Sequence, residues 1–202
     1  MKKILICFVF LSFAFLNGVA HAKETGLKKT LSGLEKIPIA YGVNHFRLDG
    51  TDIIIVRAEL PSEVAGYGDI YTVIYNRKEK WELVQYPNHA FDTGTWPRTE
   101  EDAVSTAFFI TTGKTGNNLK TLYLLKAKRA FKDSAADPGV ATFELYSVQE
   151  NGDFGFFEIQ KIDTFKTEKK YGNIDCALKE ELGVSLTEKS FVDSRCVDHR
   201  TP

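Results

Sequence analysis

Short β-forming runs separated by turn-forming residues recur along this chain, and this pattern constrains the fold more than any other feature. In the first pair, residues 43–48 and 52–58 flank Asp49-Gly50, which tolerates the positive φ angles of a tight hairpin turn. In the second run, residues 53–56 are all β-branched and apolar, so polar and apolar residues do not alternate there. A continuous apolar run of this kind predicts a central strand that is covered on both faces.

Three further pairs of strand-like runs follow the first: 70–75 with 81–86 around a charged loop at 76–80, 103–112 with 119–127 around a turn at 113–118, and 140–148 with 154–165 around an Asn-Gly turn at 150–153. Hairpins that follow one another are typical of antiparallel sheets. The sequence therefore predicts a mainly β fold, in which antiparallel hairpins form a β-sandwich or two packed sheets.

Outside the hairpins, the clearest pattern is one short C-terminal helix at residues 174–182. Asn173 is its expected N-cap and Gly183 its expected C′ residue. Residues 23–37 are polar with a weak helical spacing of leucines, so they form either a short helix or a loose arm. We expect a single β-rich domain over residues 23–184, with two halves (38–86 and 103–184) joined by a polar loop at 87–102, and a polar tail at 185–202.

The first 22 residues have the three parts of an export signal. Lys2 and Lys3 form a positive start, residues 4–16 form an apolar run, and Ala20-His21-Ala22 is a small-x-small cleavage triplet. The apolar run is shorter than the roughly 20 residues that a membrane span needs. We expect cleavage after Ala22 and a mature protein in the periplasm or another extracellular space, without a membrane span.

Two cysteines, Cys176 and Cys196, remain after this cleavage. In an oxidising compartment such a pair is a disulfide candidate, and the bond would tie the tail to the last helix. An equally good interpretation is two thiols too far apart to bridge, because sequence alone does not bring their Cα atoms within about 7 Å.

Charge and motifs exclude several functions. The formal net charge of −1 argues against a nucleic-acid partner, which needs a cationic surface. The chain contains no Gly-x-Ser-x-Gly, His-Glu-x-x-His or Ser-x-x-Lys motif. We therefore expect no enzymatic activity, metal or cofactor. An enzyme would need a titratable cluster in a cleft, such as His45 or His89 beside a carboxylate.

The most unusual segment is residues 126–138, KAKRAFKDSAADP. Arg129 is able to hold a carboxylate with two parallel hydrogen bonds, and Asp133, Ser134 and Asp137 either lock the loop or contact a polar ligand. The structural alternative is an internal pair between Arg129 and Asp133 or Asp137 that orders a long crossover.

Short motifs in the second half carry a resemblance to a known family: residues 122–129, 131–134 (FKDS), 136–138 (ADP), 140–146 (VATFELY), 156–158 (FFE), 169–171 (KKY) and 181–183 (ELG). In the first half the shared stretches are 52–58, which contains Arg57, and 69–75 (DIYTVIY). With these residues the chain resembles the CarG-like carbapenem self-resistance proteins over most of residues 43–184. Members of this family are small exported proteins.

The chain departs from the family pattern at three places. Family members often carry one cysteine early in the second half and one directly after the Lys-Lys-Tyr run, where this chain has Ala103 and Gly172. Residues 60–68 replace the polar segment that usually follows the strand of Arg57. The tail beyond Ser185 is an addition.

The resemblance implies a periplasmic protein that protects against a carbapenem β-lactam without hydrolysing it, by binding the drug or a cell-wall target. A carbapenem is a small bicyclic anion, so a plausible site pairs an arginine with aromatic walls. The candidates are Arg129, Arg57, Tyr171 and Trp96, to which the polar loop adds Asp133 and Asp137. The alternative is a periplasmic interaction module that binds a cell-envelope protein, and a homo-oligomer is compatible with either.

Overall fold

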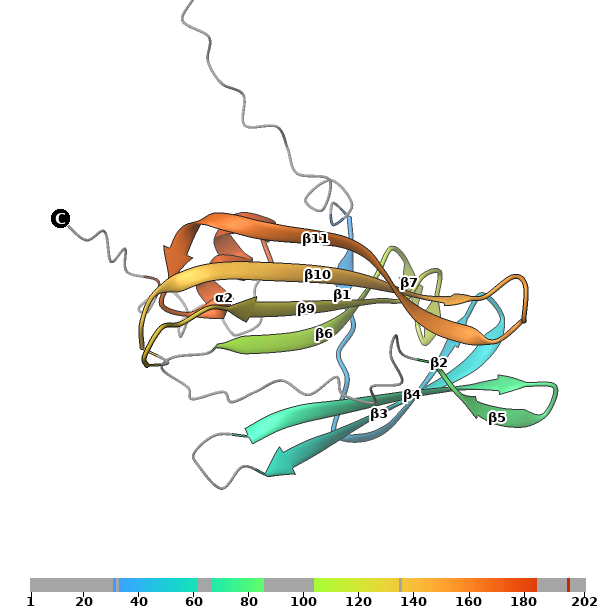
Figure 1. Cartoon of the computed structure of the whole chain (residues 1–202). Helices are drawn as coiled ribbons and strands as arrows, with labels where there is room; N and C mark the ends of the chain where they lie inside the picture. Colours follow the sequence, from blue (N-terminus) through green and yellow to red (C-terminus); the bar gives the residue numbers. More distant parts are fainter. Residues whose placement is uncertain are drawn as a thin grey trace, which may run out of the picture.

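The computed structural model describes residues 31, 33–61, 67–85, 104–134, 136–184 and 196. The predicted export signal, the loop at 87–102 and most of the tail at 185–202 lie outside these residues. The described residues form a five-stranded sheet, a six-stranded sheet and one short C-terminal helix, and Figure 1 shows the two sheets as separate layers. The predicted mainly β fold of packed antiparallel hairpins is confirmed.

The five-stranded sheet is antiparallel throughout and is formed mainly by the second half of the chain. Its strands, in spatial order, are β1 (Glu35–Lys36), β6 (Ser105–Thr111), β9 (Tyr123–Arg129), β10 (Gly139–Glu150) and β11 (Phe157–Tyr171).

The six-stranded sheet is formed mainly by the first half of the chain. Its neighbouring strands are antiparallel except for one parallel contact between β2 and β8. In spatial order they are β5 (Lys80–Leu83), β4 (Tyr67–Arg77), β3 (Thr51–Pro61), β2 (Gly42–Leu48), β8 (Asn118–Leu119) and β7 (Lys114–Thr115).

The two halves exchange short strands. β1 lies directly before the first half but pairs with β6 of the second half. The segment predicted as a single turn at 113–118 contains β7 and β8, which join the other sheet. Arg47 donates its backbone N–H to the carbonyl of Asn117 at 2.9 Å, which extends the contact between β2 and this segment. The simple-turn prediction was therefore wrong, because the connection supplies edge strands to the opposite sheet.

The N-terminal segment also differs from its prediction. The difference lies at its end: Leu31 is helical, residues 23–30 and 32 lie outside the described residues, and Glu35 and Lys36 form a strand. Ile37 donates its backbone N–H to the carbonyl of Phe109 at 2.8 Å. Ile37 and Ile39 then lie buried between the sheets. Burial of these two side chains accounts for the extended conformation, because their alternate spacing matches a strand period and not a helical one.

Two hydrophobic cores cover the two faces of the five-stranded sheet. The main core lies between the sheets and includes Phe46, Ile55, Val73, Phe109 and Leu124. The second core lies on the other face, against the helix, and includes Phe108, Phe143, Leu145, Ile174 and Leu178. Every residue of β6 is buried as a consequence.

The prediction that residues 53–56 are covered on both faces was wrong. β3 is a central strand, but only Ile53 and Ile55 point into the core, while Ile54 and Val56 on the other face are half-buried. The apolar run instead gives the six-stranded sheet an outer face with aliphatic side chains.

Turn predictions had mixed outcomes. Asp49 and Gly50 both have positive φ, as predicted for the first hairpin. The second hairpin closes through only Lys78 and Glu79, which also have positive φ. The predicted Asn-Gly turn was wrong, because residues 151–156 form a wider loop in which the N–H of Asn151 donates to the carbonyl of Phe156 at 2.7 Å.

The C-terminal helix begins at the predicted cap. The Asn173 side chain accepts a hydrogen bond from the N–H of Asp175 at 2.8 Å, α2 spans Ile174–Ala177, and a π-helical turn continues over Leu178–Leu182. Gly183 ends it in the left-handed conformation, with φ of 69°. A disulfide joins Cys176 to Cys196, so the tail is attached to the helix at one point.

A glycine at the start of β10 provides a test of this packing. A Cβ atom at Gly139 would lie 1.8 Å from the carbonyl oxygen of Ala130, so Gly139→Ala requires the backbone to move. We expect a loss of roughly 2–4 kcal/mol in the free energy of unfolding, measured by urea denaturation. Gly152→Ala is the matched control, because no atom lies within 4 Å there and φ is not positive. Equal stability of the two variants would contradict the described contact.

Candidate ligand-binding site between the two sheets

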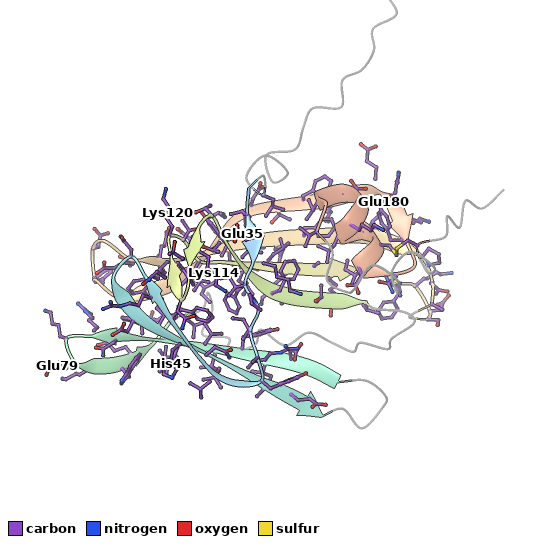
Figure 2. The ribbon with its side chains drawn as sticks, turned by 180° about the vertical axis from the view of Figure 1, so that it is seen from behind. Glu35, His45, Glu79, Lys114, Lys120 and Glu180 are labelled. Carbon is purple, nitrogen blue, oxygen red and sulfur yellow. A yellow bond between two sulfur atoms is a disulfide. The ribbon has the colours of Figure 1, made fainter. Side chains whose placement is uncertain are left out.

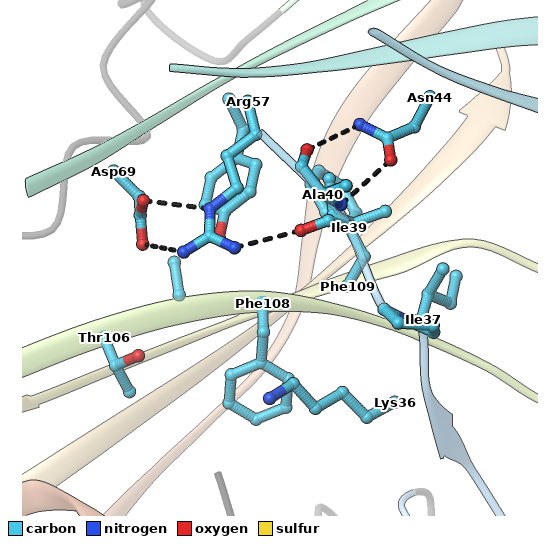
Figure 3. A pocket seen from close by; sticks show the side chains of 13 residues that line it. Lys36, Ile37, Ile39, Ala40, Asn44, Arg57, Asp69, Thr106, Phe108 and Phe109 are labelled. Carbon is cyan, nitrogen blue, oxygen red and sulfur yellow. Dashed lines mark hydrogen bonds and ion pairs between the residues drawn. The ribbon is translucent and has the colours of Figure 1, made fainter. Parts of the chain in front are cut away.

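A cavity of about 670 Å³ lies between the sheets, beside the connector from β1 to β2 (Figure 3). Its walls come from the connector, from β2, β3 and β4, and from β6, and the lining residues are 36–40, Asn44, Arg57, Asp69, Tyr71 and 106–109. Four consecutive residues of β6 line it. Because successive strand residues alternate between faces, this cavity meets β6 along its edge.

Arg57 is held at this cavity by several hydrogen bonds. Its Nε and Nη2 donate to the two carboxylate oxygens of Asp69, each at 2.9 Å, and Nη1 donates to the carbonyl of Ile39 at 2.9 Å. Figure 3 shows this bidentate pair and the bond to the connector. Burial acts to lower the pKa of Arg57, but the hydrogen bonds to Asp69 outweigh it, so the pKa is raised and the guanidinium stays charged.

The connector is held in place from both sides. The Asn44 side chain accepts from the N–H of Ala40 at 2.9 Å and donates to the carbonyl of Ala40 at 2.8 Å. The Tyr41 ring lies over the guanidinium of Arg57, with its centroid 4.2 Å from Cζ. These contacts join the connector to β2 and β3 and hold this wall of the cavity in place.

Aromatic side chains supply the apolar part of the wall. Tyr71 and Phe109 are buried and meet edge to face, with ring centroids 5.4 Å apart. The Lys36 ammonium lies 5.8 Å from the centre of the Phe108 ring. The cavity therefore combines an arginine, a carboxylate, an amide and aromatic rings, which is a suitable set for a small ligand with polar and apolar parts.

The structure places Arg129 elsewhere. Its side chain is fully buried, on the same face of β9 as Ala127, and it donates to the carbonyl oxygen of Asp137 at 2.7 Å. The Asp137 carboxylate accepts from the backbone N–H groups of Asp133 and Ser134, each at 2.8 Å, and these bonds lower its pKa. Arg129, Asp133 and Asp137 thus order the loop, although the arginine contacts the Asp137 backbone and not its carboxylate.

Tyr171 also lies on the far side of the five-stranded sheet. Its side chain is buried in the second core, and its hydroxyl lies within hydrogen-bond distance of Glu180, at 3.1 Å, and of Glu181. Burial and these carboxylates raise its pKa, so it remains a neutral phenol. Figure 2 shows Glu180 on the C-terminal helical turn, away from His45 on the six-stranded sheet.

Of the predicted site residues that the structure describes, only Arg57 therefore lines the cavity. Trp96 lies outside the described residues. The partners that sequence reasoning missed are Asp69, Tyr71 and Asn44. Asp69 and Tyr71 belong to the DIYTVIY stretch that carried part of the family resemblance, which was the one available signal.

Two kinds of feature are absent from the described residues. No group of three or more His, Cys, Asp and Glu side chains is placed to hold a metal ion in this part of the chain. Within the same residues, no helix has the length and apolar character needed to span a bilayer.

Comparison with known proteins gives a fold-level similarity. No protein-family model and no curated protein sequence matches the chain. Among solved structures, the crystal structure of CarG superposes with a TM-score of 0.57 and 17% sequence identity, covering 72% of this chain and 94% of that chain. The chain therefore has a CarG-like fold.

The bonds of Tyr171 generate a prediction about stability. Tyr171→Phe removes a buried hydroxyl that bridges to the helix, and we expect a loss of about 1–2 kcal/mol in the free energy of unfolding, measured by thermal and urea denaturation. Tyr41→Phe is the control, because that side chain is 54% exposed and should change stability by less than about 0.5 kcal/mol. A Tyr171→Phe protein as stable as the wild type would show that the hydroxyl does not secure the helix.

Proposed function

We propose that this chain is an exported, non-enzymatic binding protein that protects against a carbapenem β-lactam without hydrolysing it. The observation that carries the proposal is the cavity between the sheets, which is lined by Arg57 and aromatic side chains in a CarG-like fold. The similarity in the sequence motifs supports the same assignment.

The cavity has the size and the chemistry that the proposal needs. Its volume of about 670 Å³ lies within the range of roughly 300–1,000 Å³ typical of small-molecule sites. Tyr71 and Phe109 provide flat apolar surface for a ring system, and Asn44 and the Arg57–Asp69 pair provide donors and acceptors. Because hydrogen bonds already fix Arg57 and Asn44, little side-chain ordering is needed when a ligand binds.

The lining side chains supply donors, acceptors and rings, which suit binding, and the proposal assigns no bond-breaking step to them. The described disulfide between Cys176 and Cys196 supports export, because disulfides persist in oxidising compartments such as the periplasm. The charged start, apolar run and cleavage triplet of the first 22 residues support the same location.

A second candidate function is an interaction module for a cell-envelope protein. It is favoured by the outer face of the six-stranded sheet, where Val43 is 61% exposed, Trp81 49% and Leu83 37%. Ile54 and Ile74 are half-buried and lie in one cross-strand row with Leu83. A contiguous apolar surface of this kind often marks a protein contact.

The first proposal predicts binding without a product. Titration calorimetry should detect binding of a carbapenem, while mass spectrometry finds the drug unchanged. Ala40→Trp places a large side chain at the exposed rim of the cavity and should weaken binding at least about tenfold, which corresponds to a change of about 1.4 kcal/mol. Ala58→Trp is the matched control, because Ala58 is also exposed but does not line the cavity.

Two results would contradict this proposal. One is the absence of both binding heat and thermal stabilisation of the wild-type protein. The other is conversion of the drug to a hydrolysed product by the purified wild-type protein.

The second candidate predicts a specific capture from envelope extract. Wild-type protein should retain a partner that Val43→Glu loses, because the charge disrupts the apolar outer face. Ile162→Glu, at a position 45% exposed on β11, is the control and should retain the partner. Equal capture by all three proteins would remove this candidate.

A further inference from the structure

One edge of β6 is paired over only part of its length. On the other edge, β6 pairs with β9 over residues 105–110, but its pairing with β1 covers only the last two residues of β6. The N–H of Ile37 adds one bond beyond β1, to the carbonyl of Phe109 at 2.8 Å. Within the described residues, no strand pairs with this edge of β6 at positions 105–108.

The connector after β1 leaves β6 because its backbone groups are bonded elsewhere. Pro38 has no N–H to donate, and the carbonyl of Ile39 accepts from Nη1 of Arg57 at 2.9 Å. Ala40 is bonded to the side chain of Asn44 through both its N–H and its carbonyl. Figure 3 shows the connector beside Arg57 and Asn44, with β6 on the other side of the cavity. The cavity therefore lies where a continued β1 would run along β6.

The backbone hydrogen-bonding groups of β6 alternate between its two edges. The N–H of Arg129 donates to the carbonyl of Val104, directly before β6, at 2.8 Å, so Val104 and every second residue after it face β9. The residues between them face the opposite edge, as the carbonyl of Phe109 does when it accepts from the connector. The N–H and the carbonyl of Ala107 therefore point toward the cavity, which Ala107 lines.

Ala107 offers one donor and one acceptor to the cavity. In the described part of the chain, no group is hydrogen-bonded to its N–H or to its carbonyl. Ala107 is only 5% exposed, and buried peptide groups in folded proteins nearly always have a hydrogen-bond partner. A ligand that presents an acceptor and a donor with the spacing of one strand residue satisfies both groups at once.

We infer that the cavity binds a short extended peptide, which adds to the five-stranded sheet as an antiparallel strand beside β6, in line with β1. The central residue of the peptide donates its N–H to the carbonyl of Ala107 and accepts from the N–H of Ala107. Strand residues rise about 3.4 Å each, so the stretch of β6 that lines the cavity, residues 106–109, is about 10 Å long and accommodates about three peptide residues. This inference concerns the same cavity as the proposed function but does not depend on carbapenem binding.

The surroundings of Ala107 specify the peptide further. Residues that pair directly across two strands point to the same face, and Ala107 points into the main core between the sheets. The central side chain of the peptide therefore lies on the side of Tyr71 and Phe109, and the small side chain of Ala107 leaves room for a large apolar one. Arg57 and Asp69 neutralise each other, so the site favours a peptide without charged ends.

The test is an NMR titration of the wild-type protein with acetyl-threonyl-isoleucyl-threonine amide and with two N-methylated forms of this peptide. At saturation, the parent peptide should shift the amide resonance of Ala107 and slow its hydrogen exchange at least about tenfold, while exchange of the Phe108 amide, which faces β9, stays unchanged. A methyl group on the isoleucine nitrogen removes the donor to Ala107 and should weaken binding at least about tenfold. A methyl group on the nitrogen of the second threonine is the matched control, because that N–H points away from β6, and affinity should stay within about twofold.

A pair of protein variants places the peptide in the cavity. Ala40→Trp, at the cavity rim, should weaken binding of the parent peptide at least about tenfold, whereas Ala58→Trp, at an exposed position outside the cavity, should match the wild type.

Four results would overturn the inference: no change at the Ala107 amide with the parent peptide, equal binding of the isoleucine-methylated peptide, equal loss of binding with either methyl group, or unchanged binding to Ala40→Trp. The drug takes no part in this experiment. Its outcome is therefore independent of whether the protein binds a carbapenem, and either proposal is able to fail while the other stands.

Discussion

Both faces of the five-stranded sheet have to be covered, and the rest of the structure follows from how this is done. β9 and β10 carry large apolar side chains on both faces, such as Leu124 on one and Phe143 on the other. Fully burying one such side chain is worth about 1.5–3 kcal/mol, so neither face is stable in water alone. The helix with its disulfide covers one face, and the six-stranded sheet covers the other.

The six-stranded sheet covers its face unevenly. Near Leu124 and Phe109 the two sheets share a continuous apolar core, whereas farther along β9 the same face becomes polar at Lys126 and Lys128. The cavity lies beside this change, next to the connector that carries the chain from one sheet to the other. The position of the cavity therefore follows from the fold. Apolar side chains pack the two sheets together over one part of their interface, and polar side chains occupy another part. The pair formed by Arg57 and Asp69 fixes the wall at that boundary.

Local patterns predicted the fold class and several elements. Asp49-Gly50, Asn173 and Gly183 have the conformations that their residue types favour, because turns and helix caps depend on a few neighbouring residues. The strand exchange through β1 and β7–β8 was not predictable, because two-residue strands carry no periodicity. The covering of residues 53–56 was misjudged for a related reason: an apolar run does not reveal how many layers pack on it.

The candidate site was predictable only in part. Arg57 was identified from the sequence. Its pairing with Asp69 was not, because it depends on the register between β3 and β4, and the sequence between these strands has no pattern that predicts this register. Arg129 and Tyr171 have side chains of the types that binding sites use. However, side chains alternate between the two faces of a strand, and both of these lie on the face that the helix covers.

The most direct measurement is a crystal structure of the protein soaked with a carbapenem. The account predicts intact drug between the two sheets, in the cavity beside Arg57 and Asn44, with its ring system against Tyr71 and Phe109. A drug molecule bound only outside this region, or one covalently attached to a side chain, would contradict the account.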